Sequence, residues 1–220
     1  MMNKKVTIEY YSDVLCIWAW IAQRRLDELN QQLGDRIEIR YRYMNIFGDV
    51  YHKINTQWQE RGGFPGFAQH VKHSAEPYED AIVHNNIWQS TQPSTSANAH
   101  LFLKAIELVA GSKLSGELAR QVRKAFYCDC QDISNFSVLN SLIEPFDVDN
   151  DSVSQLINNG QAMAALMNDY KAANDHMLKG SPSYIIDNGR QVLFGNVGYR
   201  ILLANVEEQL KNPDSEASWC

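Results

Sequence analysis

Residues 12–20, SDVLCIWAW, place a cysteine where a predicted strand meets a predicted helix. The preceding segment, residues 5–11 (KVTIEYY), combines β-branched and aromatic residues with partial alternation, which is typical of a strand. After Cys16, apolar residues recur at three- and four-residue spacing as far as Leu33, and Gly34 supplies a stop signal. We therefore expect Cys16 at the start of the first helix.

A second strand is predicted at residues 36–44, RIEIRYRYM, because apolar and charged side chains alternate there. Its separation from the first strand suits a parallel crossover through the intervening helix. The chain is therefore expected to open with a β-α-β unit.

The middle of the chain has helical periodicity and no convincing pair of strands. The helices predicted there cover residues 97–109, 114–126, 138–146 and 153–171, and the predicted loops cover residues 61–66, 92–96, 111–116 and 147–151. This block, from about residue 48 to about residue 174, is expected to be all-helical.

The end of the chain returns to strands, at residues 183–187 and 191–194. Asn188-Gly189 between them is a strong hairpin signal, and an amphipathic helix follows at residues 199–210. The whole order is that of an α/β protein with a thioredoxin fold and a large all-α domain inserted after the second strand. We expect a discontinuous thioredoxin-like domain, residues 1–47 and 174–220, and an inserted helical domain, residues 48–173.

Composition excludes several classes of partner. The chain has 220 residues, a formal net charge of -6 and 45% hydrophobic residues, values typical of a globular protein with no preference for polyanions such as nucleic acid. No stretch approaches the roughly 18 apolar residues of a membrane span, and the N-terminus has no continuous apolar segment of the signal-peptide type. We expect a cytoplasmic protein with no membrane partner. The oligomeric state stays open, with a dimer as one option.

Cys16 is the first candidate for chemistry. The positive end of a helix favours a thiolate, and such a position can lower a thiol pKa from about 8.5 to between about 3.5 and 7.5. Cys16 would then be a nucleophile at neutral pH. Local sequence leaves an alternative, in which Cys16 is a small residue buried inertly behind the helix.

A proline near the other end of the chain is the second candidate. Gly180-Ser181-Pro182 immediately precedes a predicted strand, and a proline that enters a central strand usually has a special role. A cis Ser181-Pro182 bond would be one such role, whereas an ordinary trans proline at a strand start is the alternative.

SDVLCIWAW together with residues 179–198, KGSPSYIIDNGRQVLFGNVG, resembles the DsbA-like thioredoxin family. The resemblance is to its cytoplasmic branch, which also contains 2-hydroxychromene-2-carboxylate isomerases and kappa-class glutathione transferases. It implies that Cys16 is the attacking cysteine, that Trp18 is the aromatic residue of the motif, and that Ser181-Pro182 is the loop that offers its backbone to a peptide or glutathione. A looser match, at residues 94–103 (STSANAHLFL), implies a place for His100 in the cleft, against the alternative of an ordinary histidine at a helix start.

The sequence departs from the family motif at two positions. Ile17 stands where the motif usually has proline, and Ala19 stands where it has the second cysteine. A dithiol enzyme needs that second thiol to cut the mixed disulfide. A mixed disulfide at Cys16 must therefore wait for an external thiol or for a cysteine from elsewhere in the chain.

The remaining cysteines give weaker signals. Cys128 and Cys130 could close a strained disulfide or bind a soft metal, but two ligands without a nearby histidine do not make a convincing zinc site. Cys220 ends a polar tail and could reach Cys16, glutathione or another chain. Bystander thiols are the alternative for all three, and no metal site is expected. His70 and His73 fit a solvated helix face, and Asp13 could influence Cys16 or simply cap the turn.

Three functions are compatible with these features. The first is a monothiol thiol-disulfide oxidoreductase or isomerase, in which Cys16 forms mixed disulfides with a protein or with glutathione. The second is a glutathione-dependent transferase or isomerase, although related members place a serine where Cys16 stands. The third is a non-enzymatic binding protein of the same fold. No tightly bound cofactor is expected, glutathione is a candidate co-substrate, and the partner would be a protein disulfide or a small-molecule thiol.

Overall fold

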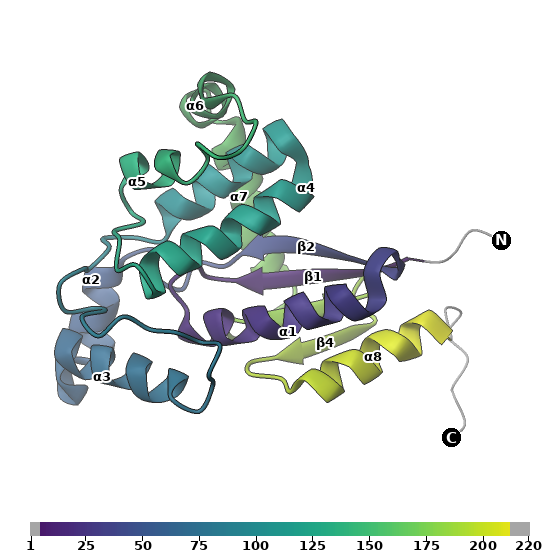
Figure 1. Ribbon diagram of the computed structural model, residues 1–220, viewed down its shortest axis with the longest axis horizontal. Coiled ribbons are helices and arrows are strands. Elements are labelled where there is room, and N and C mark those ends of the chain that lie inside the picture. The colour runs from purple at the N-terminus through teal and green to yellow at the C-terminus, as the bar shows by residue number, and fades with distance from the viewer. Residues whose placement is uncertain (1–4, 212–220) are drawn as a thin grey trace.

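The computed structural model describes residues 5–211, which form a four-stranded sheet and the helices that cover it (Figure 1). The strands are β1 (Val6–Ser12), β2 (Ile37–Tyr43), β3 (Ser183–Ile186) and β4 (Gln191–Phe194). The α-helices are α1 (Ile17–Leu33), α2 (Val50–His52), α3 (Gly63–Ala75), α4 (Ala97–Tyr127), α5 (Phe136–Ser141), α6 (Asn150–Asn158), α7 (Gln161–Asp175) and α8 (Tyr199–Lys211). Short turns of 3-10 or π geometry cover residues 34–36, 53–57 and 59–61.

The sheet has the strand order β2-β1-β3-β4. β1 is parallel to β2, whereas β3 is antiparallel to β1 and β4 is antiparallel to β3. With α2 to α7 between β2 and β3, this is a thioredoxin fold that carries a helical insertion, so the predicted fold class is confirmed. The predicted domain boundaries fall after β2 and in the last turn of α7.

Helices cover both faces of the sheet. Ile8 and Tyr10 of β1 are fully buried and belong to one large apolar cluster with the inner faces of α1 and α8, which lie side by side in Figure 1. Tyr11, the next residue, packs instead with Ala173 of α7 in a second cluster. Alternation along β1 therefore directs neighbouring side chains into different layers, as expected for a central strand.

The predicted break between the helices at residues 97–109 and 114–126 is present within the span of α4. Gly111 is non-helical (φ 87°, ψ 170°), and Ser115 Oγ donates to the carbonyl oxygen of Leu103 at 2.8 Å, so the two halves of α4 pack against each other. The break is shorter than the predicted loop of residues 111–116, because helical backbone resumes directly after Gly111.

Three other predicted boundaries are wrong. The predicted helix at residues 138–146 corresponds to α5, which already ends at Ser141. The predicted helix at residues 153–171 is broken into α6 and α7, because Gly160 has a positive φ of 84° that ends one helix and starts the next. The predicted loop at residues 61–66 contains the first turn of α3.

The second half of α4 places Gly116 against β2. A Cβ atom at this position would lie 2.7 Å from the ring of Tyr41, so only glycine allows this close approach. The same glycine that favoured a loop in the sequence therefore serves helix-to-sheet packing.

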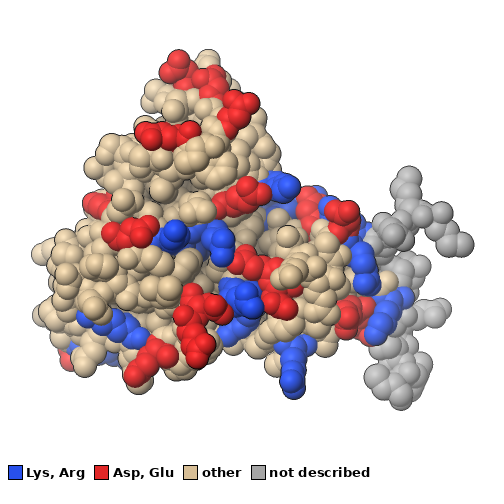
Figure 2. Space-filling view, viewed as in Figure 1, with Lys and Arg blue, Asp and Glu red and all other residues tan. Residues whose placement is uncertain are grey.

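Among residues 5–211, no helix combines the length and the apolarity that crossing a bilayer requires. Figure 2 shows basic and acidic side chains interspersed around the middle of the molecule, and acidic side chains at the tip where α6 lies in Figure 1.

Candidate active site

Cys16 lies at the junction of β1 and α1, as the N-cap residue of α1. Only 7% of its surface is exposed, and its Sγ donates a hydrogen bond to the carbonyl oxygen of Ser181 at 3.2 Å. The Ser181-Pro182 peptide bond is cis. Two segments that are 165 residues apart in the chain thus meet at the thiol.

The pKa of Cys16 moves in the direction opposite to the one expected from the helix N-terminus. Burial is the largest cause and raises the pKa of the thiol. Hydrogen bonding with the Ser181 side chain and with backbone N-H groups in the first turn of α1 lowers the pKa, but these effects do not outweigh burial. The resting form of Cys16 near neutral pH is therefore the protonated thiol, and the expectation of a lowered pKa is wrong.

Asp13 connects the loop between β1 and α1, residues 12–16 (the Cys16 loop), to two other segments. Its carboxylate is fully buried and accepts four hydrogen bonds, from the N-H groups of Leu15 (2.9 Å), Ile46 (3.1 Å) and Phe47 (2.9 Å) and from Ser96 Oγ (2.8 Å). Its own N-H group donates to Ser181 Oγ at 3.0 Å. Asp13 therefore ties the Cys16 loop to the segment after β2, to the start of α4 and to the proline loop.

His100 lies behind the Cys16 loop and is fully buried. Its Nε2 accepts the N-H of Val14 at 3.2 Å, so Nδ1 carries the proton and donates to the hydroxyl of Tyr170 at 3.0 Å. Burial lowers the pKa of His100 to about 4, although Asp13 lies 3.8 Å from Nε2. His100 is therefore a neutral side chain that holds the backbone beside Cys16 and has no exposed surface in the cleft.

Two further residues of α4 hold the Cys16 loop, and the sequence did not single them out. Tyr127 donates its hydroxyl proton to the carbonyl oxygen of Leu15 at 2.6 Å, and Arg123 donates from Nη2 to Ser12 Oγ at 2.7 Å. Both side chains are fully buried. Their four-residue spacing was visible, but it fits any buried helix face, so the only usable signal was a lone arginine in an otherwise apolar stripe.

The two tryptophans behind Cys16 differ in their surroundings. Trp18 is partly exposed on the first turn of α1. Trp20 stacks on Tyr127, with ring centres 5.8 Å apart, and donates from Nε1 to the carbonyl oxygen of Ile82 at 3.1 Å. Trp20 therefore joins α1 to the end of α4 and to the segment before it.

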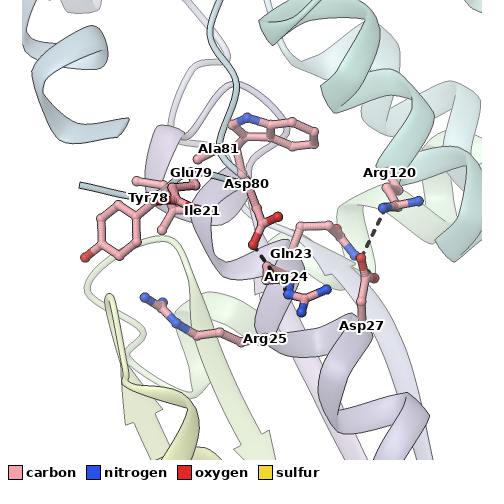
Figure 3. Close-up of a pocket in the computed structure, with 11 residues that line it drawn as sticks. Ile21, Gln23, Arg24, Arg25, Asp27, Tyr78, Glu79, Asp80, Ala81 and Arg120 are labelled. Carbon is pink, nitrogen blue, oxygen red and sulfur yellow. Dashed lines mark hydrogen bonds and ion pairs between the residues drawn. The ribbon is translucent and has the colours of Figure 1, made fainter. Parts of the chain in front are cut away.

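A cavity of about 410 Å³ lies farther along α1 (Figure 3). Its lining carries three arginines and three carboxylates, and two ion pairs cross it, Arg24 to Asp80 at 3.4 Å and Arg120 to Asp27 at 3.2 Å. Cys16 is not among the residues that line it. The cavity is therefore an open, charge-balanced depression beside the site.

The remaining described cysteines do not contact Cys16. Cys128 Sγ donates to the carbonyl oxygen of Ile82 at 3.5 Å, and Cys130 Sγ lies 3.5 Å from Thr91 Oγ1. All three cysteines within residues 5–211 are free thiols, and Cys220 lies outside the described residues.

No metal cluster accompanies the site. No group of three or more histidine, cysteine, aspartate or glutamate side chains within residues 5–211 is arranged to hold a metal ion. His70 contacts the ring of Trp58, with centres 4.8 Å apart, and His73 is exposed beside Glu76.

Comparisons with solved structures show proteins that share this fold. A proposed protein disulfide isomerase from Nitrosomonas europaea superimposes with a TM-score of 0.78 at 12% identity, over 94% of this chain and 98% of that one. The cytosolic disulfide reductase DsbM from Pseudomonas aeruginosa, also solved with GSH, gives a TM-score of 0.71 at 18% identity, over 93% of this chain and 98% of that one. A 2-hydroxychromene-2-carboxylate isomerase gives a TM-score of 0.65 at 14% identity, over 96% of this chain and 100% of that one.

At these identities the structural likeness shows a shared fold. A comparison with curated protein sequences gives no match. The sequence profile of the DSBA-like thioredoxin domain, in contrast, matches residues 7–207, which is most of the chain. The chain therefore belongs to the DSBA-like thioredoxin domain family.

Proposed function

We propose that this protein is a monothiol thiol-disulfide exchange enzyme in which Cys16 forms a mixed disulfide with its substrate. The observation that carries the proposal is the contact between Cys16 Sγ and the carbonyl oxygen of Ser181, next to the cis Ser181-Pro182 bond. A substrate disulfide laid along this loop would bring one sulfur to the thiol. Family membership supports the same reaction type.

The reaction begins with loss of the Cys16 proton to solvent. The thiolate attacks one sulfur of a substrate disulfide, a new S-S bond joins Cys16 to that half, and the other half leaves as a thiolate that takes up a proton. A second thiol then attacks the mixed disulfide and releases Cys16 in its original state. The exchange conserves electrons, because one disulfide is consumed and one is formed.

The second thiol is proposed to come from outside the chain. Ala19 occupies the position of a second motif cysteine and is fully buried, so no thiol is available there. Cys128 and Cys130 bond to other segments of the inserted region. Glutathione, the ligand in one structure of the Pseudomonas reductase, is the small thiol we propose as co-substrate. We also propose a cytoplasmic location, supported by the free state of the described cysteines.

Turnover of a glutathionylated peptide tests the proposal. In the presence of glutathione, the wild-type protein should release the peptide thiol, and Cys16→Ser should reduce that rate to the uncatalysed value. Cys128→Ser is the matched control and should retain wild-type turnover. A Cys16→Ser variant with unchanged turnover would refute the proposal. A Cys16→Ser variant that loses exchange but isomerises or conjugates a glutathione-dependent substrate would point to the transferase class instead.

The state of the isolated protein gives a second test. Intact mass measured without reductant should include a fraction with added mass, and peptide mapping should place that mass on Cys16. A mixed disulfide found on Cys128 or Cys130 in preference to Cys16 would contradict the assignment.

A further inference from the structure

Arg123 of α4 is a buried cation beneath the Cys16 loop. The side chain is fully buried, and its hydrogen bonds go to neutral oxygens: Ser12 Oγ at 2.7 Å, and Gln23 Oε1 and the carbonyl of Ala119 at 3.4 Å. Its Nε is buried without a hydrogen-bond partner. The guanidinium also lies 5.9 Å from the ring centre of Tyr10. The charge is therefore held without a carboxylate in direct contact.

Such an arrangement is costly for a purely structural arginine. Buried cations are normally paired with a carboxylate, because desolvation of the charge must be offset. An apolar side chain of similar volume would fill this space without that cost. Packing alone therefore does not explain a charged side chain at position 123.

Few other groups near the loop carry charge at neutral pH. The titratable side chains that face Arg123 and Cys16 from the packed elements are Tyr10 of β1, Asp13 of the loop, Tyr41 and Tyr43 of β2, His100 and Tyr127 of α4, and Tyr184 of β3. Burial raises the pKa of each of these tyrosines and lowers the pKa of His100, so all of them are neutral. Asp13 acts directly on Cys16, and Arg123 acts on Tyr10, His100 and Tyr127, which surround the same loop. Asp27 of α1 is the next carboxylate, since Gln23 bonds to both Asp27 and Arg123.

Arg123 and Tyr127, both on α4, hold the Cys16 loop next to the thiol. Arg123 holds Ser12 at the end of β1, and Tyr127, one helical turn later, holds the carbonyl of Leu15 immediately before Cys16. Arg123 is thus fixed to the same rigid loop as the thiol. A second negative charge at Cys16 would add to that of Asp13, and the guanidinium is the cation that offsets both.

We propose that Arg123 is a positioning residue for the Cys16 reaction, an inference that rests on the proposed function: its guanidinium anchors the Cys16 loop and supplies the buried positive charge that stabilises the Cys16 thiolate. The effect applies when Cys16 loses its proton to attack and again when its sulfur leaves the mixed disulfide. Arg123 acts by holding the Cys16 loop and by the electric field of its guanidinium group, and it contacts no reacting atom.

The pH dependence of Cys16 alkylation tests this role. Iodoacetamide reacts with the full-length protein, and mass spectrometry follows the Cys16 peptide separately from the other cysteines. Arg123→Lys keeps the charge, Arg123→Gln keeps a neutral donor for Ser12, and Arg123→Met keeps neither. Arg120→Met, an exposed arginine one turn earlier on α4, is the matched control.

Loss of the charge should move the alkylation midpoint upward. As a general magnitude, a unit charge that acts on a thiol over about 10 Å through an effective dielectric constant of about 20 shifts the thiol pKa by about one unit. Arg123→Met and Arg123→Gln should therefore react about tenfold more slowly than wild type below the midpoint. Arg123→Lys should restore most of the rate, and Arg120→Met should match wild type.

Three results would overturn the proposal. One is an unchanged midpoint in a folded Arg123→Gln protein, and another is an equal shift in Arg123→Lys and Arg123→Gln. The third is a wild-type alkylation rate in Arg123→Gln but not in Arg123→Lys, because the hydrogen bond to Ser12, and not the charge, would then be responsible. Arg123→Gln also covers the case in which Arg123→Met does not fold. Because alkylation needs no disulfide substrate, a wild-type protein without turnover would remove the proposed function and leave these midpoints interpretable.

Discussion

His100 should make the stability of the protein depend on pH between neutral and mildly acidic conditions. The folded state holds the imidazole neutral, with a pKa of about 4, whereas an unfolded chain gives histidine a pKa of about 6.5. As pH falls below 6.5, the unfolded state takes up a proton that the folded state does not accept. The stabilising contribution is therefore present above about pH 6.5 and is lost as the pH falls toward 4.

The size of the effect follows from the two pKa values. Complete loss across the window corresponds to about 3 kcal/mol of unfolding free energy, and the change from about pH 7 to about pH 5 corresponds to about 2 kcal/mol. The full value applies because the ring is buried and unscreened by solvent.

Urea unfolding at several pH values measures this contribution. His100→Gln keeps an acceptor for the Val14 N-H and a donor for Tyr170, but it cannot be protonated. The difference in unfolding free energy between wild type and this variant should shrink by about 2 kcal/mol from about pH 7 to about pH 5. His73→Gln, at a histidine whose side chain is 84% exposed, is the control. Parallel pH profiles for wild type and His100→Gln would refute the reasoning.

Other predictions concern the same loop and its support. Tyr127→Phe leaves a buried carbonyl without its donor and should lower the unfolding free energy by about 1–3 kcal/mol in urea. Gly116→Ala places a Cβ 2.7 Å from the Tyr41 ring and should cost about 1–3 kcal/mol in the same assay. Since burial raises the pKa of Cys16, its alkylation rate should keep rising beyond about pH 8.5, where an ordinary thiol is half ionised. Ala19→Cys should form a disulfide with Cys16 on mild oxidation, visible as the loss of two hydrogens in the intact mass, because residues three apart in a helix lie within disulfide reach.

Matched controls separate these effects from general perturbation. Tyr51→Phe removes a hydroxyl from a side chain that is 73% exposed and should leave stability unchanged. Gly180→Ala adds a Cβ with no atom within 4 Å and should cost little. Ala22→Cys adds a thiol at another fully buried alanine of α1 and should not pair with Cys16. A midpoint below about pH 8.5 for Cys16 alkylation would contradict the raised pKa.

The fold was largely readable from the sequence because its strands are short and strongly patterned. Alternation in residues 36–44, the Asn188-Gly189 hairpin signal and the stop at Gly34 correspond to β2, the turn between β3 and β4, and the end of α1. Most of the errors came from glycines, whose meaning depends on tertiary context. Gly111 indicated a break that the structure has, but Gly116 lies inside the second half of α4, where the close approach to Tyr41 needs a residue without a side chain.

The site was readable only in part. Cys16 and the Ser181-Pro182 segment stood out because a lone cysteine at a helix start and a proline before a strand are locally unusual. The direction of the Cys16 pKa could not be predicted, since burial depends on how the loops close around the thiol. The hydrogen bonds by which Arg123 and Tyr127 hold the Cys16 loop could not be predicted either, because buried polar side chains on an amphipathic helix have no characteristic spacing.

The hydrogen bonds between the inserted helices and residues 12–15 indicate that the insertion contributes to the site. A division at residues 47 and 174 assigns the Cys16 loop to one domain and its buried supports, Ser96, His100, Arg123 and Tyr127, to the other. Each of these four side chains bonds to a different group of residues 12–15, so removal of the insertion would expose the loop and leave several buried polar groups unsatisfied. A thioredoxin-like core alone would keep the cysteine but lose the order of the backbone that presents it. The helical insertion is therefore part of the candidate active site, and substitutions more than 80 residues away from Cys16 in the chain should alter its chemistry.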